Sequence, residues 1–527
     1  MKKEEYDKNK IVQFVIWVIT FVIVHGEMIF NKLSWHDDIY FVDKFNRDMD
    51  FGRIYGLSHG RFSLFFLVKI VENMTIEGMT ASPVEQGIIA AVCSICMGYL
   101  ILRILDIKGI ISRAAVVLIC ISIPATAGNL GYMTVAGYDL VGALLAVTAA
   151  YCCICQQEKK PFILSAVLLA FAIGEYQCYL TLFLSILLCS FFKNIFEEEQ
   201  KRNLLVIFIK YVVVTLLGLV MYLIINKAVL WYYHESLSDY GTINSYGIVS
   251  VVEYFERIAI AYKDFLTPDY TIYTMFPIRK EWHMIIVLVL LLELMVSTVY
   301  IIHRKGFVEG VLIVLSMLVT PVIFNFNIVM YGTEPLHALH QYQYIMLYAL
   351  IIMLADLIHS TIIGCLRIEN DKLGRLFKGI VGGYVILISF LYIRYDNLCY
   401  MEAELRQNQA VSYFDSLISD IHNTEGYYNE IPVCYVNEFN KRLPSNHDNY
   451  QGKNLIITNP YNEDIMGNIA MNHSWREYMY QWCNYAPVDI VHISQMSAEA
   501  KTRIEKMPRY PDKGSIEVIE DTLIVNF

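Results

Sequence analysis

The chain has 527 residues, of which 56% are hydrophobic and 17% are charged, and its formal net charge is −10. Soluble globular proteins have about 25% charged residues, so this composition excludes an ordinary soluble protein and is typical of a chain with many membrane spans. The acidic balance and the lack of a basic stripe exclude a nucleic-acid-binding protein.

Apolar runs recur along residues 1–398. A bilayer core of ~30 Å requires about 20 apolar residues in a helix. The first run follows a basic segment and no cleavage site follows it, so we expect a retained helix and not a signal peptide. The pattern predicts a polytopic α-helical membrane protein with about eleven spans, of which the fifth and sixth could instead form one broken helix: 11–30, 85–103, 110–127, 138–156, 161–174, 176–193, 204–231, 283–302, 307–330, 337–358 and 378–397.

The charges of the connections predict which side each one faces. If the N-terminus is cytoplasmic, the inside connections hold 18 Lys and Arg in 51 residues, whereas the outside connections hold 10 in 130. Cytoplasmic loops are enriched in Lys and Arg. We therefore expect a multi-pass protein of a cytoplasmic membrane, with long outer loops at 31–84 and 232–282 and an extracytoplasmic C-terminal domain.

The two long outer loops contain amphipathic segments. Residues 246–266 place apolar side chains such as Val251, Phe255 and Phe265 on one helical face, which predicts a helix lying on the membrane surface. Residues 35–50 show a weaker form of the same pattern. The apolar run 62–70 is too short to span and predicts a re-entrant segment.

Residues 399–527 change character and predict a small soluble α/β domain. Residues 400–425 read as a helix, and four later segments rich in β-branched residues read as strands: IPVCYV, NLIIT, VDIVHI and SIEVIEDTLIVNF. A Rossmann-like order is one arrangement of these elements. The domain has no GxGxxG segment, so no nucleotide site is predicted.

No metal site is predicted from the cysteines. Cys152, Cys153 and Cys155 lie within an apolar run and lack the paired CxxC arrangement of a zinc site. Cysteines in such a run behave as small apolar residues.

An acidic pair follows the first span, in Ser34-Trp35-His36-Asp37-Asp38. Adjacent carboxylates at a membrane surface repel each other and are costly to desolvate. Asp37 and Asp38 are therefore candidates for a general base and an acidic neighbour that orients it. A solvated helix N-terminus, where Asp is favoured, is the alternative.

Cationic residues lie where the outer loops enter the membrane. His59 and Arg61 precede the short apolar run 62–70, and an Arg at this position can hold a phosphate in a bidentate pair. Contact with lipid headgroups is the alternative. Arg279 is a further outer cation of the same kind.

The break between the fifth and sixth spans contains Glu175, Tyr176 and Gln177. A carboxylate and an amide at membrane depth indicate a polar cavity. An ordinary short loop is the alternative.

Two histidines lie near the outer start of the tenth predicted span, in Tyr331-Gly332-Thr333-Glu334-Pro335 and the residues that follow. His337 and His340 share one helical face with Glu334 near them. Metal ligation is possible, but hydrogen bonding to a sugar or a phosphate fits better because no HExxH motif is present.

Several of these motifs, taken in order, resemble the O-antigen type II glucosyltransferase family of bacteria. They are the acidic pair Asp37-Asp38, the Gly60-Arg61-Phe62 segment, the span GYDLVGALLAVTAA beginning near Tyr138, and the segment AIGEYQCYL. The resemblance covers roughly residues 11–400. It implies a GT-C-like enzyme that uses a polyprenyl-phosphate sugar, which is glucose in this family, and modifies a cell-envelope glycan.

Carried over residue by residue, the resemblance makes Asp38 or Asp37 the base and Arg61 a ligand of the donor phosphate. Glu175, Tyr176, Gln177 and Tyr138 would line the sugar cavity. Members of the family carry an Arg near the outer start of a late span, where this sequence has Glu334 to His337. His337 or His340 would replace that contact only in part.

The chemistry of such a transfer needs few groups. A sugar phosphate already has a good leaving group, so one carboxylate that deprotonates the acceptor hydroxyl and cations that hold the phosphate are sufficient. The acidic pair could bind Mg²⁺ or Mn²⁺, but it lacks the D-x-D spacing, and we expect no cofactor.

Two other functions remain open from the sequence. A transporter or flippase would have polar residues at the bilayer midplane and repeated halves; Glu293 is such a residue, but no internal repeat is visible. A non-catalytic assembly protein would depend on the tail and not on the first loop.

Overall fold

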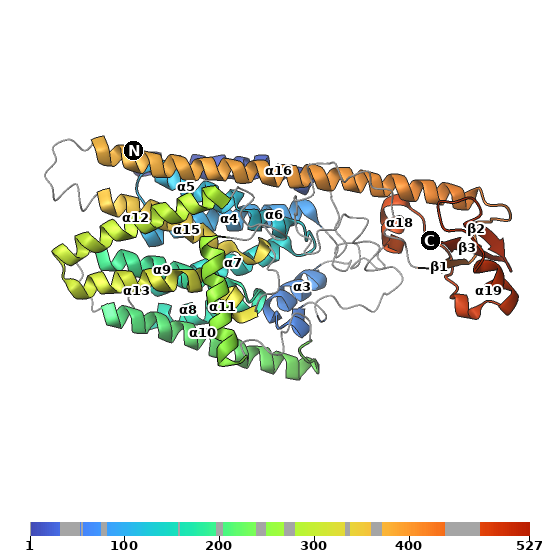
Figure 1. Ribbon diagram of the computed structural model, residues 1–527, viewed down its shortest axis with the longest axis horizontal. Coiled ribbons are helices and arrows are strands. Elements are labelled where there is room, and N and C mark those ends of the chain that lie inside the picture. The colour runs from blue at the N-terminus through green and yellow to red at the C-terminus, as the bar shows by residue number, and fades with distance from the viewer. Residues whose placement is uncertain are drawn as a thin grey trace. The chain divides into compact units, whose positions relative to one another are not determined.

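The computed structural model describes residues 2–31, 53, 56–74, 82–155, 159–196, 204–238, 249–267, 280–331, 338–359, 372–437 and 475–527 (Figure 1). The chain forms two compact units, which divide between Cys399 and Tyr400 inside one long helix. We describe each unit by itself.

The membrane unit is helical throughout its described residues. Its α-helices are α1 Lys2–Phe30, α3 Phe62–Met74, α4 Pro83–Leu105, α5 Ile110–Ser122, α6 Pro124–Leu130, α7 Ala136–Cys155, α8 Lys159–Glu175, α9 Tyr179–Phe196, α10 Leu204–Tyr233, α11 Val251–Leu266, α12 Lys280–Arg304, α13 Phe307–Phe324, α14 Phe326–Tyr331, α15 Ile345–Ile358 and the first half of α16 Lys372–His422. Three short 3₁₀ turns are η2 Leu57–His59, η4 Ala338–His340 and η5 Tyr342–Tyr344.

The chain is a polytopic membrane protein. Nine helices of the described residues are long and apolar enough to cross a bilayer, with α5 and α6 together counted as one. The remaining two expected spans are shorter apolar helices, at 161–175 and 342–358. The break between α8 and α9 separates two distinct helices, so the alternative of a single broken helix is wrong.

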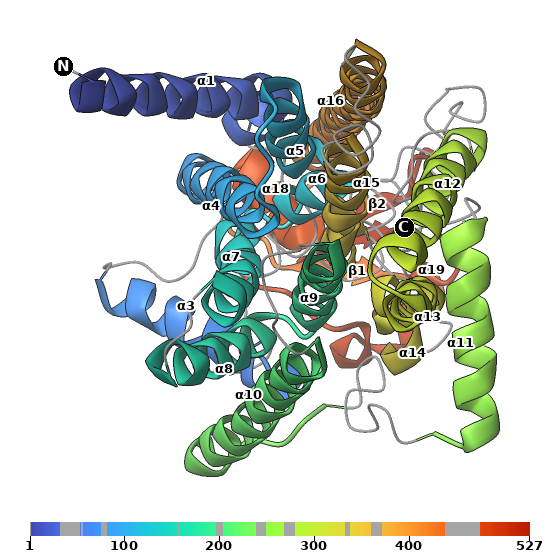
Figure 2. The ribbon, with the colours of Figure 1, turned by 90° about the vertical axis from the view of Figure 1, so that its left-hand side faces the viewer.

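The most buried span is α9, at the centre of the bundle (Figure 2). Helices α7, α8, α10, α13 and α15 surround and contact it. In contrast, α10 leaves most of its apolar side chains exposed, Leu216 and Ile224 among them. A helix that is apolar on every side is stable only when protein or lipid covers it, so we assign this surface to the bilayer.

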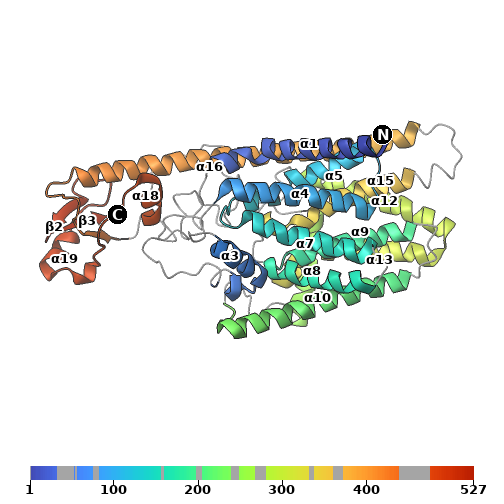
Figure 3. The ribbon, with the colours of Figure 1, turned by 180° about the vertical axis from the view of Figure 1, so that it is seen from behind.

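Two elements within the loops that the sequence predicts to face outward are short helices that do not span. Helix α3 is 13 residues long and packs against α7 and α8 at one end of the bundle (Figure 3). Helix α11 confirms the amphipathic helix expected within 246–266, and it runs across the direction of the spans (Figure 1). It begins later than predicted because the Ser250 side chain caps it by accepting a hydrogen bond from the Glu253 N–H.

Helix α11 packs on the protein through Arg257, Ala261 and Phe265 and leaves other apolar side chains exposed. Arg257 is buried and donates to the carbonyl oxygens of Val329 and Met330 at 3.1 and 3.0 Å. Val252 and Phe255 remain about two-thirds exposed, at 68% and 69%. This exposed apolar edge is what a helix at a lipid surface requires.

The C-terminal unit combines the second half of α16 with α18 Trp475–Cys483, η9 Ile493–Gln495, α19 Ala498–Ile504 and a three-stranded sheet. The strands are β1 Val433–Val436, β2 Ile516–Ile519 and β3 Thr522–Asn526, in the order β1-β3-β2. Strand β3 pairs parallel with β1 and antiparallel with β2. Phe414, Trp475, Tyr478 and Phe527 pack between α16, α18 and the sheet.

The strand predictions for this unit are partly right. IPVCYV forms β1, and SIEVIEDTLIVNF forms the β2–β3 hairpin. VDIVHI makes only a bridge between Val433 and Ile490 before the chain turns into η9, and NLIIT lies outside the described residues. The described strands form a mixed sheet with a hairpin, so the Rossmann-like order is wrong for them.

Candidate functional site

The break between α8 and α9 packs against the turn that precedes α3. Gln177 Nε2 donates to the carbonyl oxygen of His59 at 2.8 Å. The Tyr222 hydroxyl of α10 donates to the carbonyl oxygen of Gly60 at 3.1 Å. Gly60 has a φ of 70°, and a Cβ there would lie 2.9 Å from the Tyr222 hydroxyl. The turn is therefore held between α9 and α10, with Arg61 as its next residue.

Close packing joins α3 to α8 beside this turn. A Cβ at Gly174 would lie 2.5 Å from the Phe62 ring, so the ring rests directly on the helix backbone. The Ser63 hydroxyl donates to the carbonyl oxygen of Phe171 at 2.8 Å. Both contacts fix the start of α3 and therefore the position of Arg61.

Arg61 stacks on an aromatic side chain of the break. Its guanidinium carbon lies 3.9 Å from the centroid of the Tyr176 ring, within the range of a cation–π interaction. The Tyr176 hydroxyl hydrogen-bonds to His340 Nε2 at 2.5 Å, and the two rings stack with centroids 5.2 Å apart. Tyr176 thus connects Arg61 with η4.

Two carboxyl groups lie in the electrostatic field of Arg61, Glu175 at the end of α8 and Asp139 in the first turn of α7. Glu175 is 0% exposed and Asp139 is 6% exposed. Close helix packing brings them together, because a Cβ at Gly142 would lie 2.6 Å from the Glu175 side chain. Buried acids at membrane depth are costly and mark functional sites.

Residues 26–354 of the chain match the family model described as glucosyl transferase GtrII. The chain belongs to this family. The matched range contains the four residues that meet at the site, Arg61, Asp139, Glu175 and Tyr176. The chain has no significant match among the curated proteins, nor among the solved structures.

Membership of the GtrII family confirms the resemblance drawn from the sequence. It supports a glucosyltransferase, and the apolar helices place it in a membrane. A glucosyltransferase of this kind needs a sugar donor and an acceptor. The paired acids and the stacked Arg61 are groups that such an enzyme can use.

A polar network surrounds His340 in this GtrII protein. Asn327 of α14 donates through Nδ2 to the carbonyl oxygen of His340 at 2.8 Å and accepts from the Thr181 hydroxyl at 2.6 Å. Asn325, where α13 ends, donates to the carbonyl oxygen of Ala261 at 2.9 Å. The network ties η4 and α11 to the core of the bundle.

The structure brings together only part of the set predicted from the sequence. Arg61, Glu175, Tyr176, Gln177 and His340 meet, and the His59 carbonyl oxygen contributes to the turn. The other four candidates lie outside the described residues: Asp37, Asp38, Arg279 and His337.

Tyr138 points elsewhere. Its hydroxyl donates to Glu85 Oε1 of α4 at 3.1 Å, and its neighbour Asp139 faces Arg61 instead. Successive residues of a helix face different directions, so only one of the two can contribute to the site. Asp139 is the residue that the sequence reading missed, although an acid next to an apolar span was a visible signal.

In the described part of the chain, no group of three or more His, Cys, Asp or Glu side chains could hold a metal ion.

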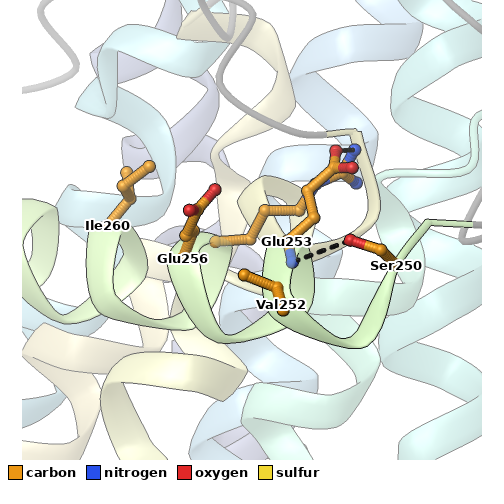
Figure 4. A pocket seen from close by; sticks show the side chains of 6 residues that line it. Ser250, Val252, Glu253, Glu256 and Ile260 are labelled. Carbon is orange, nitrogen blue, oxygen red and sulfur yellow. Dashed lines mark hydrogen bonds and ion pairs between the residues drawn. The ribbon is translucent and has the colours of Figure 1, made fainter.

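A separate groove runs along α11 and is lined by Ser250, Val252, Glu253, Glu256, Arg257 and Ile260 (Figure 4). It contains none of the residues that meet around Arg61.

Proposed function

We propose that this protein is a GT-C-like glucosyltransferase that takes its sugar from a polyprenyl phosphate. The acceptor is a cell-envelope glycan on the outer face of a bacterial cytoplasmic membrane, and the N-terminus is cytoplasmic. The observation that carries the proposal is the meeting of Arg61 with two buried acids in a member of the GtrII family.

The side of the membrane supports a lipid-linked donor. The loop charges predict that the connections before α3, before α7 and after α8 all face outward. Nucleotide sugars are absent outside the cytoplasm, so an activated sugar has to arrive on a lipid. With a cytoplasmic N-terminus and the eleven spans that the sequence predicts, the C-terminal unit, residues 399–527, would face the same side.

The reaction we propose is a direct displacement. Asp38 or Asp37 takes the proton of the acceptor hydroxyl, the hydroxyl oxygen forms a bond to the anomeric carbon, and the bond from that carbon to the phosphate oxygen breaks. The anomeric centre is inverted, and the phosphate leaves with its electron pair. Such a leaving group needs no general acid.

The described residues supply charge and position in this reaction. Arg61 is the proposed phosphate ligand, and its stacking on Tyr176 preorganises it. His340 hydrogen-bonds to Tyr176 and supports it, and the further phosphate contacts are His59, His337 and Arg279. Glu175 and Gln177 line the sugar cavity with Tyr176, and Asp139 takes the place that the sequence reading gave to Tyr138.

Metal independence is part of the proposal. The acidic pair lacks D-x-D spacing, and Arg61 already provides a fixed positive charge. Transfer should therefore proceed at an undiminished rate in excess EDTA. A loss of transfer that Mg²⁺ or Mn²⁺ restores would contradict this part.

The test is transfer by the purified protein in lipid nanodiscs, with polyprenyl-phosphate glucose and the envelope glycan. Asp37→Ala with Asp38→Ala should abolish transfer, and Arg61→Leu should reduce it strongly. Glu293→Gln is the matched control, because Glu293 is an equally buried acid on another helix. Undiminished transfer by the Asp double variant would exclude the proposed base.

The transporter hypothesis has no observation in its favour. Glu293 of α12 is buried and its carboxyl oxygens have no hydrogen-bond partner among the described residues. A single buried acid is equally compatible with a structural role, so Glu293 does not favour transport.

A further inference from the structure

A set of buried polar atoms lies at the ends of α6, α7 and α8. Within the described residues, six side-chain atoms of this set have no hydrogen-bond partner: Thr126 Oγ1, Asn129 Oδ1 and Nδ2, Asp139 Oδ1, and Glu175 Oε1 and Oε2. The four residues are between 0% and 6% exposed. Buried polar atoms are almost always paired in folded proteins, so a group of unpaired ones indicates atoms that water or a ligand satisfies.

Tyr342 of η5 connects the members of this set. Its hydroxyl donates to the carbonyl oxygen of Ala125 at 3.0 Å. The Thr126 and Asn129 side chains approach the Tyr342 hydroxyl but do not reach hydrogen-bond geometry. Asp139 interacts electrostatically with Tyr342, and the Tyr342 and Tyr179 rings lie with centroids 6.1 Å apart.

The same interactions join Glu175 to the set. Asp139 interacts electrostatically with Glu175 and with Tyr179. Asn129 therefore interacts with Tyr342, Glu175 with Tyr179 and Asp139 with both, although the three residues come from three different helices.

Charge decides what class of ligand these atoms can take. Two acids share one nearby cation, Arg61. A ligand that carries its own charge would lose its hydration among these buried groups at a high cost in free energy. A neutral polyhydroxyl compound adds no charge, donates hydrogen bonds to carboxyl and amide oxygens, and packs its apolar ring faces on tyrosines.

The residues of this set are more deeply buried than the residues around Arg61 that suit a phosphate. Arg61, Tyr176, Gln177 and His340 are half-buried, whereas the six unpaired atoms belong to buried residues. A charged phosphate is less costly to bind where it keeps some solvent. A lipid-linked sugar would then place its neutral ring against the buried set and its phosphate at the half-buried edge.

We infer that Thr126, Asn129, Asp139 and Glu175 form the subsite for the pyranose ring of the donor, and that they determine which hexose is accepted. The subsite rests on the proposed function, because it takes the sugar of a lipid-phosphate donor. A site that hydrogen-bonds a hydroxyl rejects analogues that lack it far more strongly than an apolar pocket can.

The experiment compares two lipids on the full-length protein in nanodiscs: polyprenyl phosphate and polyprenyl-phosphate glucose. Equilibrium binding is measured for the native protein, for Asn129→Leu and Asp139→Asn, and for the control Glu293→Gln. Asn129→Leu keeps the side-chain volume and removes both amide atoms. Thermal unfolding and gel filtration of each variant confirm that it is folded.

The native protein and Glu293→Gln should bind the glucosylated lipid at least about 10-fold more tightly than the bare phosphate, the ratio expected from one hydrogen bond to a charged group. In Asn129→Leu and Asp139→Asn this preference should fall to near unity. Asn129→Leu alters no ionisable group near Arg61, so it should bind polyprenyl phosphate as the native protein does. A native preference that persists in both folded variants would overturn the subsite. Failure of both lipids to bind the native protein would overturn the proposed function, and with it the donor assignment.

Discussion

The guanidinium carbon of Arg61 lies 3.9 Å from the centroid of the Tyr176 ring, although Arg61 lies in the turn before α3 and Tyr176 in the break between α8 and α9. The Gly60 turn presents Arg61, and the helix break after Glu175 presents Tyr176. An exposed cation–π pair stabilises by about 0.5–1 kcal/mol, and a desolvated one by about 2 kcal/mol or more. The pair therefore holds the cation in one place before any substrate binds.

Replacing Tyr176 should separate the role of its ring from that of its hydroxyl. Tyr176→Leu removes the face on which Arg61 rests and should lower kcat/KM by about 5- to 30-fold, the equivalent of about 1–2 kcal/mol. Tyr176→Phe keeps the ring and loses only the hydrogen bond to His340. It should retain more activity than Tyr176→Leu, and equal activities would show that Arg61 does not depend on the ring.

Filling the space at Gly142 should strain the site. The added methyl group of Gly142→Ala would lie 2.6 Å from Glu175 Cβ, and such overpacking typically costs about 1–3 kcal/mol. The matched control is Gly379→Ala in α16, where no atom lies within 4 Å of the new Cβ. Thermal unfolding in detergent should show a lower Tm for the first variant only; equal Tm values would refute the close packing.

Removing the amide of Gln177 should loosen the turn that carries Arg61. Gln177→Leu leaves the carbonyl oxygen of His59 without its 2.8 Å hydrogen bond, a loss of about 1 kcal/mol. Because the turn presents the proposed phosphate ligand, KM for the lipid donor should rise while the protein stays folded. An unchanged KM would show that the turn keeps its position without Gln177.

The C-terminal unit should contain a thiol of low reactivity. Burial, and then the nearby Asp415, raise the pKa of Cys483 to about 12. At pH 8 its alkylation, followed by mass spectrometry, should be at least about 100-fold slower in the folded chain than in urea. A folded pKa above the unfolded value gives stability that is present below the unfolded pKa of about 8.5 and is lost as pH rises toward 12. Rapid alkylation of the folded chain would contradict this burial.

The sequence predicts the spans well because their signal is local. Each apolar run is long enough to be read without knowledge of its neighbours, and the same holds for α11, whose apolar side chains repeat at helical spacing. The break at Glu175 to Gln177 was also visible, because polar residues interrupt an apolar stretch there.

What the sequence could not predict depends on tertiary packing. Asp139 resembles an ordinary first-turn Asp, which a helix N-terminus favours. Only the packing of α7 on α8 at Gly142 brings it to Glu175. In the C-terminal unit, Val488 to Ile493 has the β-branched residues of a strand, but His492 caps η9 and ends the pairing after one bridge.

In this protein, we propose, the sugar is transferred where Arg61 meets Asp139 and Glu175. The most direct measurement is an electron cryo-microscopy structure of the protein in nanodiscs with polyprenyl-phosphate glucose. We predict density for the phosphate beside Arg61 and for the sugar ring between Asp139 and Tyr342. Donor density in the groove along α11, with nothing bound around Arg61, would contradict the claim.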